Sequence, residues 1–135
     1  MSQIKEILSK YKNIAILGAS TDLSKASSVV MKFMKEYGYK VYPVNPAAVG
    51  QKIFNEQVFA KLTDIKEKVD IVDVFRPSDE AEEIAKDAIK IGANVLWLQL
   101  GITNKNAEKL VLENGISYIE NKCTKIEYEK LFLNE

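Results

Sequence analysis

Histidine is absent from this sequence, and cysteine, arginine and proline are scarce: 135 residues include Cys123, Arg76 and three prolines. A single cysteine excludes an internal disulfide framework and a multi-thiolate metal site. The lack of histidine removes the commonest metal ligand and the commonest general base. These absences exclude many familiar active sites, and the sequence predicts neither a metal site nor catalytic residues.

Net charge is also absent, because 19 basic residues balance 19 acidic ones. The overall field therefore gives no reason to expect nucleic acid or an anionic membrane as partner, and any anion site must be local. No apolar run is long enough to span a bilayer. Charged residues interrupt the N-terminal stretch, so we expect no signal peptide and, by default, a cytoplasmic location.

Short β-branched runs alternate with longer stretches of helical periodicity, and 47% hydrophobic with 28% charged residues is an ordinary globular composition. This alternation predicts an α/β fold: a single Rossmann-like domain over residues 1–135 with a doubly wound, parallel, five-stranded sheet. A short amphipathic helix is expected first, near the N-terminus. The other expected elements are strands at 13–17, 40–44, 70–75, 94–98 and 116–119 and helices at 24–37, 78–91, 103–114 and 124–133.

The simplest strand order, numbered along the chain, is 3-2-1-4-5. This order places Gly18–Ser20 and Gln99–Gly101 on either side of one crevice, with loops beginning at Asn45 and Arg76 along its border. Thr103 is expected to cap the fourth helix, and the Thr-x-x-Glu spacing that begins at Thr124 predicts a capping box for the last one.

The first strand leads through Gly18-Ala19-Ser20 into a helix N-terminus, where free backbone N–H groups and the helix dipole favour an anion such as a diphosphate. The loop is neither a G-x-G-x-x-G fingerprint nor a P-loop, and a plain tight turn is the alternative. The second strand ends at Val44-Asn45 without the carboxylate that NAD enzymes use for ribose hydroxyls. That end favours a ribose carrying a phosphate, as in NADP or coenzyme A.

Six ordered blocks, from about residue 10 to 130, resemble the small stand-alone CoA-binding proteins. That family is similar to the N-terminal CoA-binding domain of the succinyl-CoA synthetase alpha subunit. The blocks are Gly18–Ser20, Lys25 with Ser27, Pro43–Pro46, Val69–Arg76, Trp97–Gly101 and Asn121–Tyr128. The resemblance implies coenzyme A as ligand and no established reaction.

Carried over by position, the resemblance implies three groups of contacts to the cofactor: the phosphates, the adenosine and the wall of the site. The phosphates would lie on Gly18, Ala19 and Ser20 with Lys25 and Ser27 at the start of the following helix, the adenosine beside Asn45 and Pro46, and the wall would comprise Phe75, Arg76, Gln99, Leu100 and Gly101. Two positions depart from the family pattern, because Lys25 stands where arginine is common and Asn55 where glycine is common.

Structural roles are open for several of these residues. Arg76 is a candidate phosphate ligand or one half of a structural salt bridge, and Lys25 is a candidate ligand or a solvated helix residue. Cys123 follows the fifth strand, at the edge of the proposed site, where it could meet the cofactor thiol. A small buried apolar filler is the interpretation that we favour for this cysteine.

The first functional hypothesis is a protein that binds coenzyme A or an acyl-CoA without catalysis of its own, as a carrier, sensor or regulatory module. A synthetase would need a phosphohistidine, and the chain has no histidine. The alternative is an NADP-binding oxidoreductase or redox sensor, although no evident proton donor serves hydride chemistry. A third hypothesis is a partner-binding scaffold with a vestigial pocket, but no protein partner is indicated.

Overall fold

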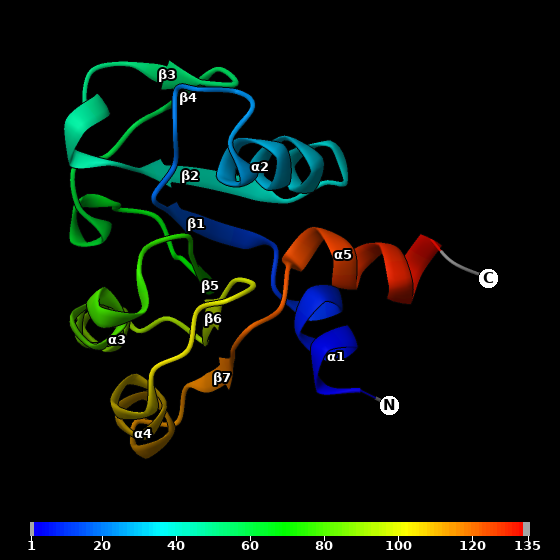
Figure 1. Ribbon diagram of the computed structural model, residues 1–135, viewed down its shortest axis with the longest axis vertical. Coiled ribbons are helices and arrows are strands. Elements are labelled where there is room, and N and C mark those ends of the chain that lie inside the picture. The colour runs from blue at the N-terminus through cyan, green and yellow to red at the C-terminus, as the bar shows by residue number, and fades with distance from the viewer. Residues whose placement is uncertain (1, 134–135) are drawn as a thin grey trace.

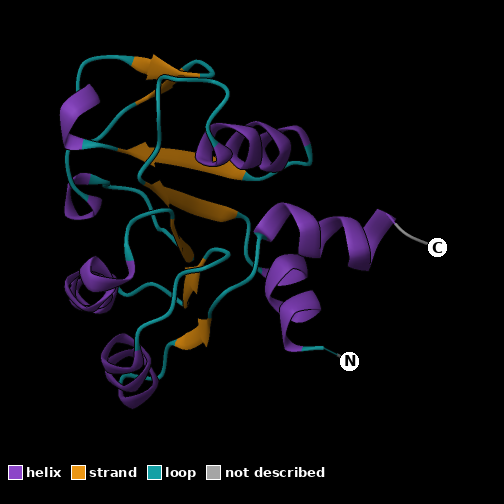
Figure 2. Cartoon of the chain, viewed as in Figure 1, coloured by secondary structure: helices purple, strands orange, loops and turns teal. Residues whose placement is uncertain are grey.

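The computed structural model describes residues 2–133 and shows a five-stranded parallel sheet with helices on both faces (Figures 1 and 2). This confirms the predicted fold class. The sheet contains β1 (Asn13–Leu17), β2 (Lys40–Val44), β5 (Ile71–Val74), β6 (Val95–Leu98) and β7 (Ser117–Ile119). The other elements are α1 (Gln3–Lys10), α2 (Ala26–Glu36), the hairpin strands β3 (Lys52–Ile53) and β4 (Glu56–Gln57), α3 (Ala81–Lys90), α4 (Lys105–Glu113) and α5 (Thr124–Tyr128), which continues as a π-helical turn (Glu129–Leu133).

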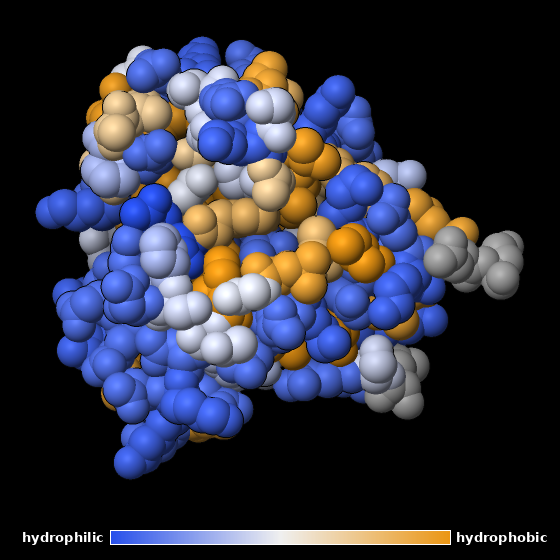
Figure 3. All heavy atoms as spheres, in the orientation of Figure 1, coloured by the Kyte–Doolittle hydropathy of each residue, from blue (hydrophilic) through white to orange (hydrophobic). Residues whose placement is uncertain are grey.

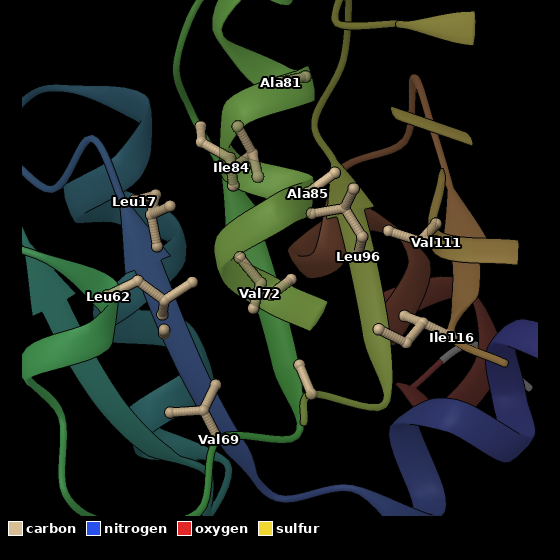
Figure 4. Packing of buried hydrophobic residues seen from close by; sticks show 14 of the residues in the cluster. Leu17, Leu62, Val69, Val72, Ala81, Ile84, Ala85, Leu96, Val111 and Ile116 are labelled. Atoms are coloured by element: carbon tan, nitrogen blue, oxygen red, sulfur yellow. The ribbon is translucent and has the colours of Figure 1, made fainter. Parts of the chain in front are cut away.

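Two apolar layers cover the sheet because successive strand residues point to opposite faces. Ala15 and Leu17 of β1 face the layer made with α3 and α4, whereas Ile14 and Ile16 face the layer made with α1 and α2. Figure 4 shows the first layer, in which strand residues such as Val72 meet the side chains of α3. The surface over α3 and α4 is largely hydrophilic in Figure 3, as expected for amphipathic helices that bury one stripe.

The strand order is β2-β1-β5-β6-β7, so the predicted order is wrong. In the sequential numbering used above, the observed order is 2-1-3-4-5, because β5 lies between β1 and β6 instead of at an edge. Pro43 gives the physical reason: it has no N–H to donate, and proline in a strand favours an edge position. The predicted order would have placed β2 inside the sheet. All four residues of β5 are buried, which suits its central position.

The connection after β2 folds into the small β3–β4 hairpin. Phe54 and Asn55 at its turn have φ of 49° and 69°. A left-handed backbone suits glycine best and asparagine better than most other residues. Asn55 therefore lies at a turn position whose backbone conformation favours glycine or asparagine.

Asp73 is fully buried in the centre of β5, in register with Ile16 of β1 and Trp97 of β6. Its carboxylate accepts hydrogen bonds from Gln99 Nε2 and from Thr124 Oγ1, the latter at 3.1 Å. Burial raises the pKa of Asp73 to about 7, although both hydrogen bonds oppose the shift.

Two predicted caps are wrong. The Thr124 hydroxyl donates to Asp73 in the core and makes no capping box; Cys123 is the N-cap of α5 and makes no side-chain cap bond. Asn104, one residue after the predicted Thr103, caps α4 by accepting from the Ala107 N–H at 2.9 Å. A tertiary contact of Thr124 explains the first difference, and a shift of one residue in the helix start explains the second.

We predict that Asp73→Asn removes a pH dependence of stability. The pKa of Asp73 is about 7 in the folded protein, against an ordinary value of 3.8 for the unfolded chain. Between pH 3.8 and pH 7, the folded state therefore binds more protons than the unfolded state. Its contribution to the free energy of unfolding is therefore largest at low pH and falls as the pH rises toward 7. Urea unfolding at pH 4 to 8 should show the variant gaining stability over the wild type, by an amount that grows up to pH 7 and then levels off.

The matched control is Asp64→Asn, which removes the same charge from an exposed position. A difference between Asp73→Asn and the wild type that is independent of pH would contradict the prediction.

Candidate functional site

A cleft of about 770 Å³ opens at the carboxyl edge of the sheet, where the segments that follow β1, β2 and β5 converge. This is the side of a parallel sheet on which ligands bind in open α/β folds. The lining residues are Leu17, Gly18, Ala19, Ser20, Lys25, Ala26, Ser27, Val44, Asn45, Pro46, Ala47, Phe75, Arg76, Glu80 and Ile84. The volume is within the range usual for small-molecule sites.

Gly18 allows the loops after β1 and β5 to touch. A side chain here would place its Cβ 2.9 Å from the carbonyl oxygen of Phe75 and 3.0 Å from Cδ of Arg76, and its φ is +88°. The Gly18 and Ala19 N–H groups both donate to the Val44 carbonyl, at 3.1 and 3.3 Å. These two amides therefore tie β1 to β2, and Gly18 has a structural role in addition to the predicted contact with a phosphate.

The loop into α2 leaves three amides free. Within residues 2–133, the N–H groups of Ser20, Ala26 and Ser27 have no acceptor. Ala26 and Ser27 are the first residues of α2, and Lys25 is its N-cap residue. Free amides at a helix start, close to a lysine, form a local positive region suited to phosphate.

Internal hydrogen bonds fix the shape of this loop. Ser28 Oγ donates to the carbonyl oxygens of Ser20 and Asp22, at 2.8 and 3.0 Å. The Asp22 carboxylate accepts from both the N–H and the hydroxyl of Ser24. The free amides are therefore held in place by the protein itself.

Asn45 joins the wall that follows β2 to the wall formed by the β1–α2 loop. Its Nδ2 donates to the Ala19 carbonyl at 2.8 Å, and its Oδ1 accepts from the Ala47 N–H at 2.8 Å. Pro46 begins a 3-10 turn (Pro46–Ala48) at the rim of the cleft. Asn45 and Pro46 thus form a rigid corner beside the Gly18–Ser20 loop.

The segment that follows β5 forms another wall of the cleft and carries an ion pair. Arg76 Nε and Nη2 donate to the two carboxylate oxygens of Glu80, at 3.0 and 2.7 Å. This contact lowers the pKa of Glu80 and raises that of Arg76, so both remain ionised near neutral pH. The salt bridge that the sequence left open for Arg76 is therefore present, and it lies inside the cleft.

Gln99, Leu100 and Gly101 do not line the cleft. Because β5 separates β1 from β6, Phe75 and Arg76 face Gly18 instead, and the predicted juxtaposition of the Gly18 and Gln99 segments is wrong. Gln99 turns inward to Asp73 and is 5% exposed. Contact of these three residues with a ligand stays a prediction.

Cys123 is half-buried and packs against the apolar layer of α1 and α2, which fits the preferred interpretation of a small filler. It does not line the cleft. Glu80 is the main lining residue that sequence reasoning missed. Its spacing of four from the single arginine is the signal that could have revealed it.

Two further features concern residues 2–133. Within this range, no group of three or more His, Cys, Asp and Glu side chains is placed to hold a metal ion. None of the described helices has the length and apolarity needed to cross a membrane.

Known proteins resemble this chain over most of its length. The family model for the CoA binding domain matches residues 12–129. YneT of Bacillus subtilis, an uncharacterized protein, is 34% identical over 125 residues, which cover 93% of this chain and 91% of YneT. A solved structure from Thermus thermophilus, cell-free ID.343, is 37% identical with a TM-score of 0.93, and the match covers 98% of this chain and 100% of that one.

A larger relative contains a similar segment. The alpha subunit of ADP-forming acetate–CoA ligase I of Pyrococcus furiosus is 27% identical over 123 residues. The match covers 84% of this chain but 27% of the ligase subunit. This chain therefore corresponds to a part of that subunit.

We predict that Gly18→Ala destabilises the fold more than Gly38→Ala. Both positions have a left-handed φ, +88° and +96°, but a Cβ at Gly38 meets no atom within 4 Å, whereas one at Gly18 meets backbone. Gly38→Ala should cost about 1–2 kcal/mol from backbone strain. Gly18→Ala should add roughly 1–3 kcal/mol from crowding, measured by urea unfolding. Equal losses in the two variants would mean that the contact with Phe75 relaxes without cost.

Proposed function

Since this chain belongs to the CoA-binding domain family, we propose that it binds coenzyme A or an acyl-CoA in the cleft at the carboxyl edge of the sheet. One observation carries the proposal: the family match over residues 12–129 includes every segment that lines the cleft. The size of the cleft and its position in the fold both suit a nucleotide-containing ligand.

The phosphates are proposed to bind at the start of α2. The free amides of Ser20, Ala26 and Ser27 and the side chain of Lys25 support this placement, because they supply donors and positive charge on one wall. The Arg76 guanidinium adds a second cation on the opposite wall. In a molecule of zero net charge, these two cations and the helix start provide the local attraction for a polyanion.

The adenosine is proposed to lie beside Asn45 and Pro46, as the family resemblance implies, and the rest of the cofactor along Phe75. The side-chain amide of Asn45 already holds the loops together, so Asn45 contributes the shape of the cleft at this position. Gly18 and Ala19 allow the backbone to approach the ligand closely, and Ser20 offers a free N–H.

The protein is proposed to act as a carrier, sensor or regulatory module that binds the cofactor without catalysis of its own. Among residues 2–133, the titratable side chains that line the cleft are Lys25, Arg76 and Glu80, and Glu80 is held by Arg76. In the free protein, no unpaired general base therefore lines the cleft among these residues. Native mass spectrometry of the purified protein would identify any retained acyl group.

We predict that CoA raises the melting temperature more than NADPH, NADH or ATP at equal concentration. A ligand that binds the folded state alone stabilises it by RT ln(1 + [L]/Kd), about 2.7 kcal/mol at a hundredfold excess over Kd. Differential scanning fluorimetry provides the measurement. An equal or larger shift with NADPH would favour the NADP-binding alternative, and the absence of a shift with any of the four would favour a vestigial pocket.

We predict that Arg76→Ala weakens CoA binding more than Lys25→Ala. Arginine can engage two phosphate oxygens with a planar fork, whereas an exposed lysine is a hydrated point charge. A charge-assisted contact is worth about 1.5–3 kcal/mol, or roughly a ten- to hundredfold change in Kd.

Isothermal titration of CoA and 3′-dephospho-CoA into both variants would measure the difference. If Lys25→Ala were the more damaging change, the phosphate site would be built around α2 alone.

A further inference from the structure

A carboxylate in the proposed anion site requires an explanation. Glu80 lines the cleft together with Lys25 and Arg76, and both of its oxygens accept from Arg76. An ionised glutamate repels a ligand with several phosphates and cancels one of the two cations that line the cleft. The cleft would attract a polyanion more strongly without it.

The protein holds Glu80 at this place through its backbone. The 3-10 turn Ser78–Glu80 connects Arg76 and Pro77 to α3. The Ser78 hydroxyl accepts from the Thr103 N–H at 3.1 Å, and the Ser78 carbonyl accepts from Asn104 Nδ2 at 2.8 Å. The turn is therefore anchored to the segment before α4, and it presents Glu80, four residues after Arg76, to the guanidinium.

The arginine is positioned from its other end as well. The Cδ atom of Arg76 is 3.0 Å from where a Cβ at Gly18 would lie, so the stem packs beside Gly18. The Arg76 and Glu80 side chains remain 48% and 44% exposed. An ion pair exposed to this degree contributes little to stability, so a ligand phosphate can replace Glu80 as the partner of Arg76.

We propose that Glu80 is an internal competitor for the anion site: it occupies the phosphate position of Arg76 in the free protein and is displaced by a phosphate of the ligand. This inference rests on the proposed binding of CoA. Every ligand that pairs with Arg76 must break the same ion pair, so Glu80 lowers the affinity for all such anions, and only an acceptor that binds the guanidinium more strongly than the carboxylate does displaces it. The diphosphate and the 3′-phosphate of CoA share this chemistry.

The experiment compares Glu80→Gln with Asp79→Asn by isothermal titration of CoA. Asp79 is a matched control, because it is an exposed neighbouring carboxylate that acts on Arg76 through charge and makes no hydrogen bond to it. Glu80→Gln should bind CoA roughly three- to tenfold more tightly than the wild type, whereas Asp79→Asn should stay within about twofold. Equal tightening for 3′-dephospho-CoA would place the diphosphate at Arg76, and tightening for CoA alone would place the 3′-phosphate there.

The single arginine provides a direct spectroscopic probe. Arg76 gives the one arginine Nε–H signal in a ¹H–¹⁵N spectrum of this chain. The free wild type and free Glu80→Gln should differ in this signal, since Glu80 accepts from Nε in the wild type. Saturation with CoA should bring the two signals to the same position, because Arg76 then has the same phosphate partner in both proteins.

Two results would overturn the inference while leaving CoA binding intact. Unchanged or weaker binding of CoA to Glu80→Gln would make Glu80 a positioning residue for Arg76. A wild-type Nε–H signal that stays at its free position at saturation would show that the ion pair persists in the complex. If the wild type itself gives no heat and no melting shift with CoA, both the proposed function and this inference fail.

Discussion

The cleft depends on a close approach between two backbone segments at Gly18. The loop after β1 passes so near the end of β5 that a Cβ would lie 2.9 Å from the Phe75 carbonyl oxygen. The same loop uses the Gly18 and Ala19 amides to hold the Val44 carbonyl of β2. Three strand ends are thereby drawn together, and the free amides at the start of α2 face the space between them. A side chain at this point would separate the walls before it met any ligand.

Charge in the cleft is arranged locally, since the chain as a whole is neutral. The start of α2 and Lys25 provide one positive wall, while Arg76 on the opposite wall is neutralised by Glu80. An internal carboxylate of this kind keeps a guanidinium ordered and partnered in the free protein, and it makes anion binding an exchange of partners. In the proposed complex, the cleft thus supplies both a cation for phosphate and the carboxylate that competes for it.

The buried carboxylate of Asp73 organises the sheet behind the cleft. It draws Gln99 from the end of β6 and Thr124 from the start of α5 toward the centre of β5. Donors from these two elements compensate part of the cost of burying a carboxylate. Gln99 consequently faces the core, although its position after a strand is typical of a ligand contact.

The sequence by itself determined the α/β class, the five parallel strands and the helices between them, because these follow from apolar periodicity and from turn residues such as Gly18. It also placed Lys25, Asn45 and Arg76 at strand or helix ends. The strand order was decided by tertiary packing, although Pro43 carried a signal for the edge position of β2. That order set which loops face each other, and so it brought Arg76 rather than Gln99 opposite Gly18. Local patterns specify elements, but contacts between elements distant in sequence depend on which surfaces pack together, and only the folded chain decides that.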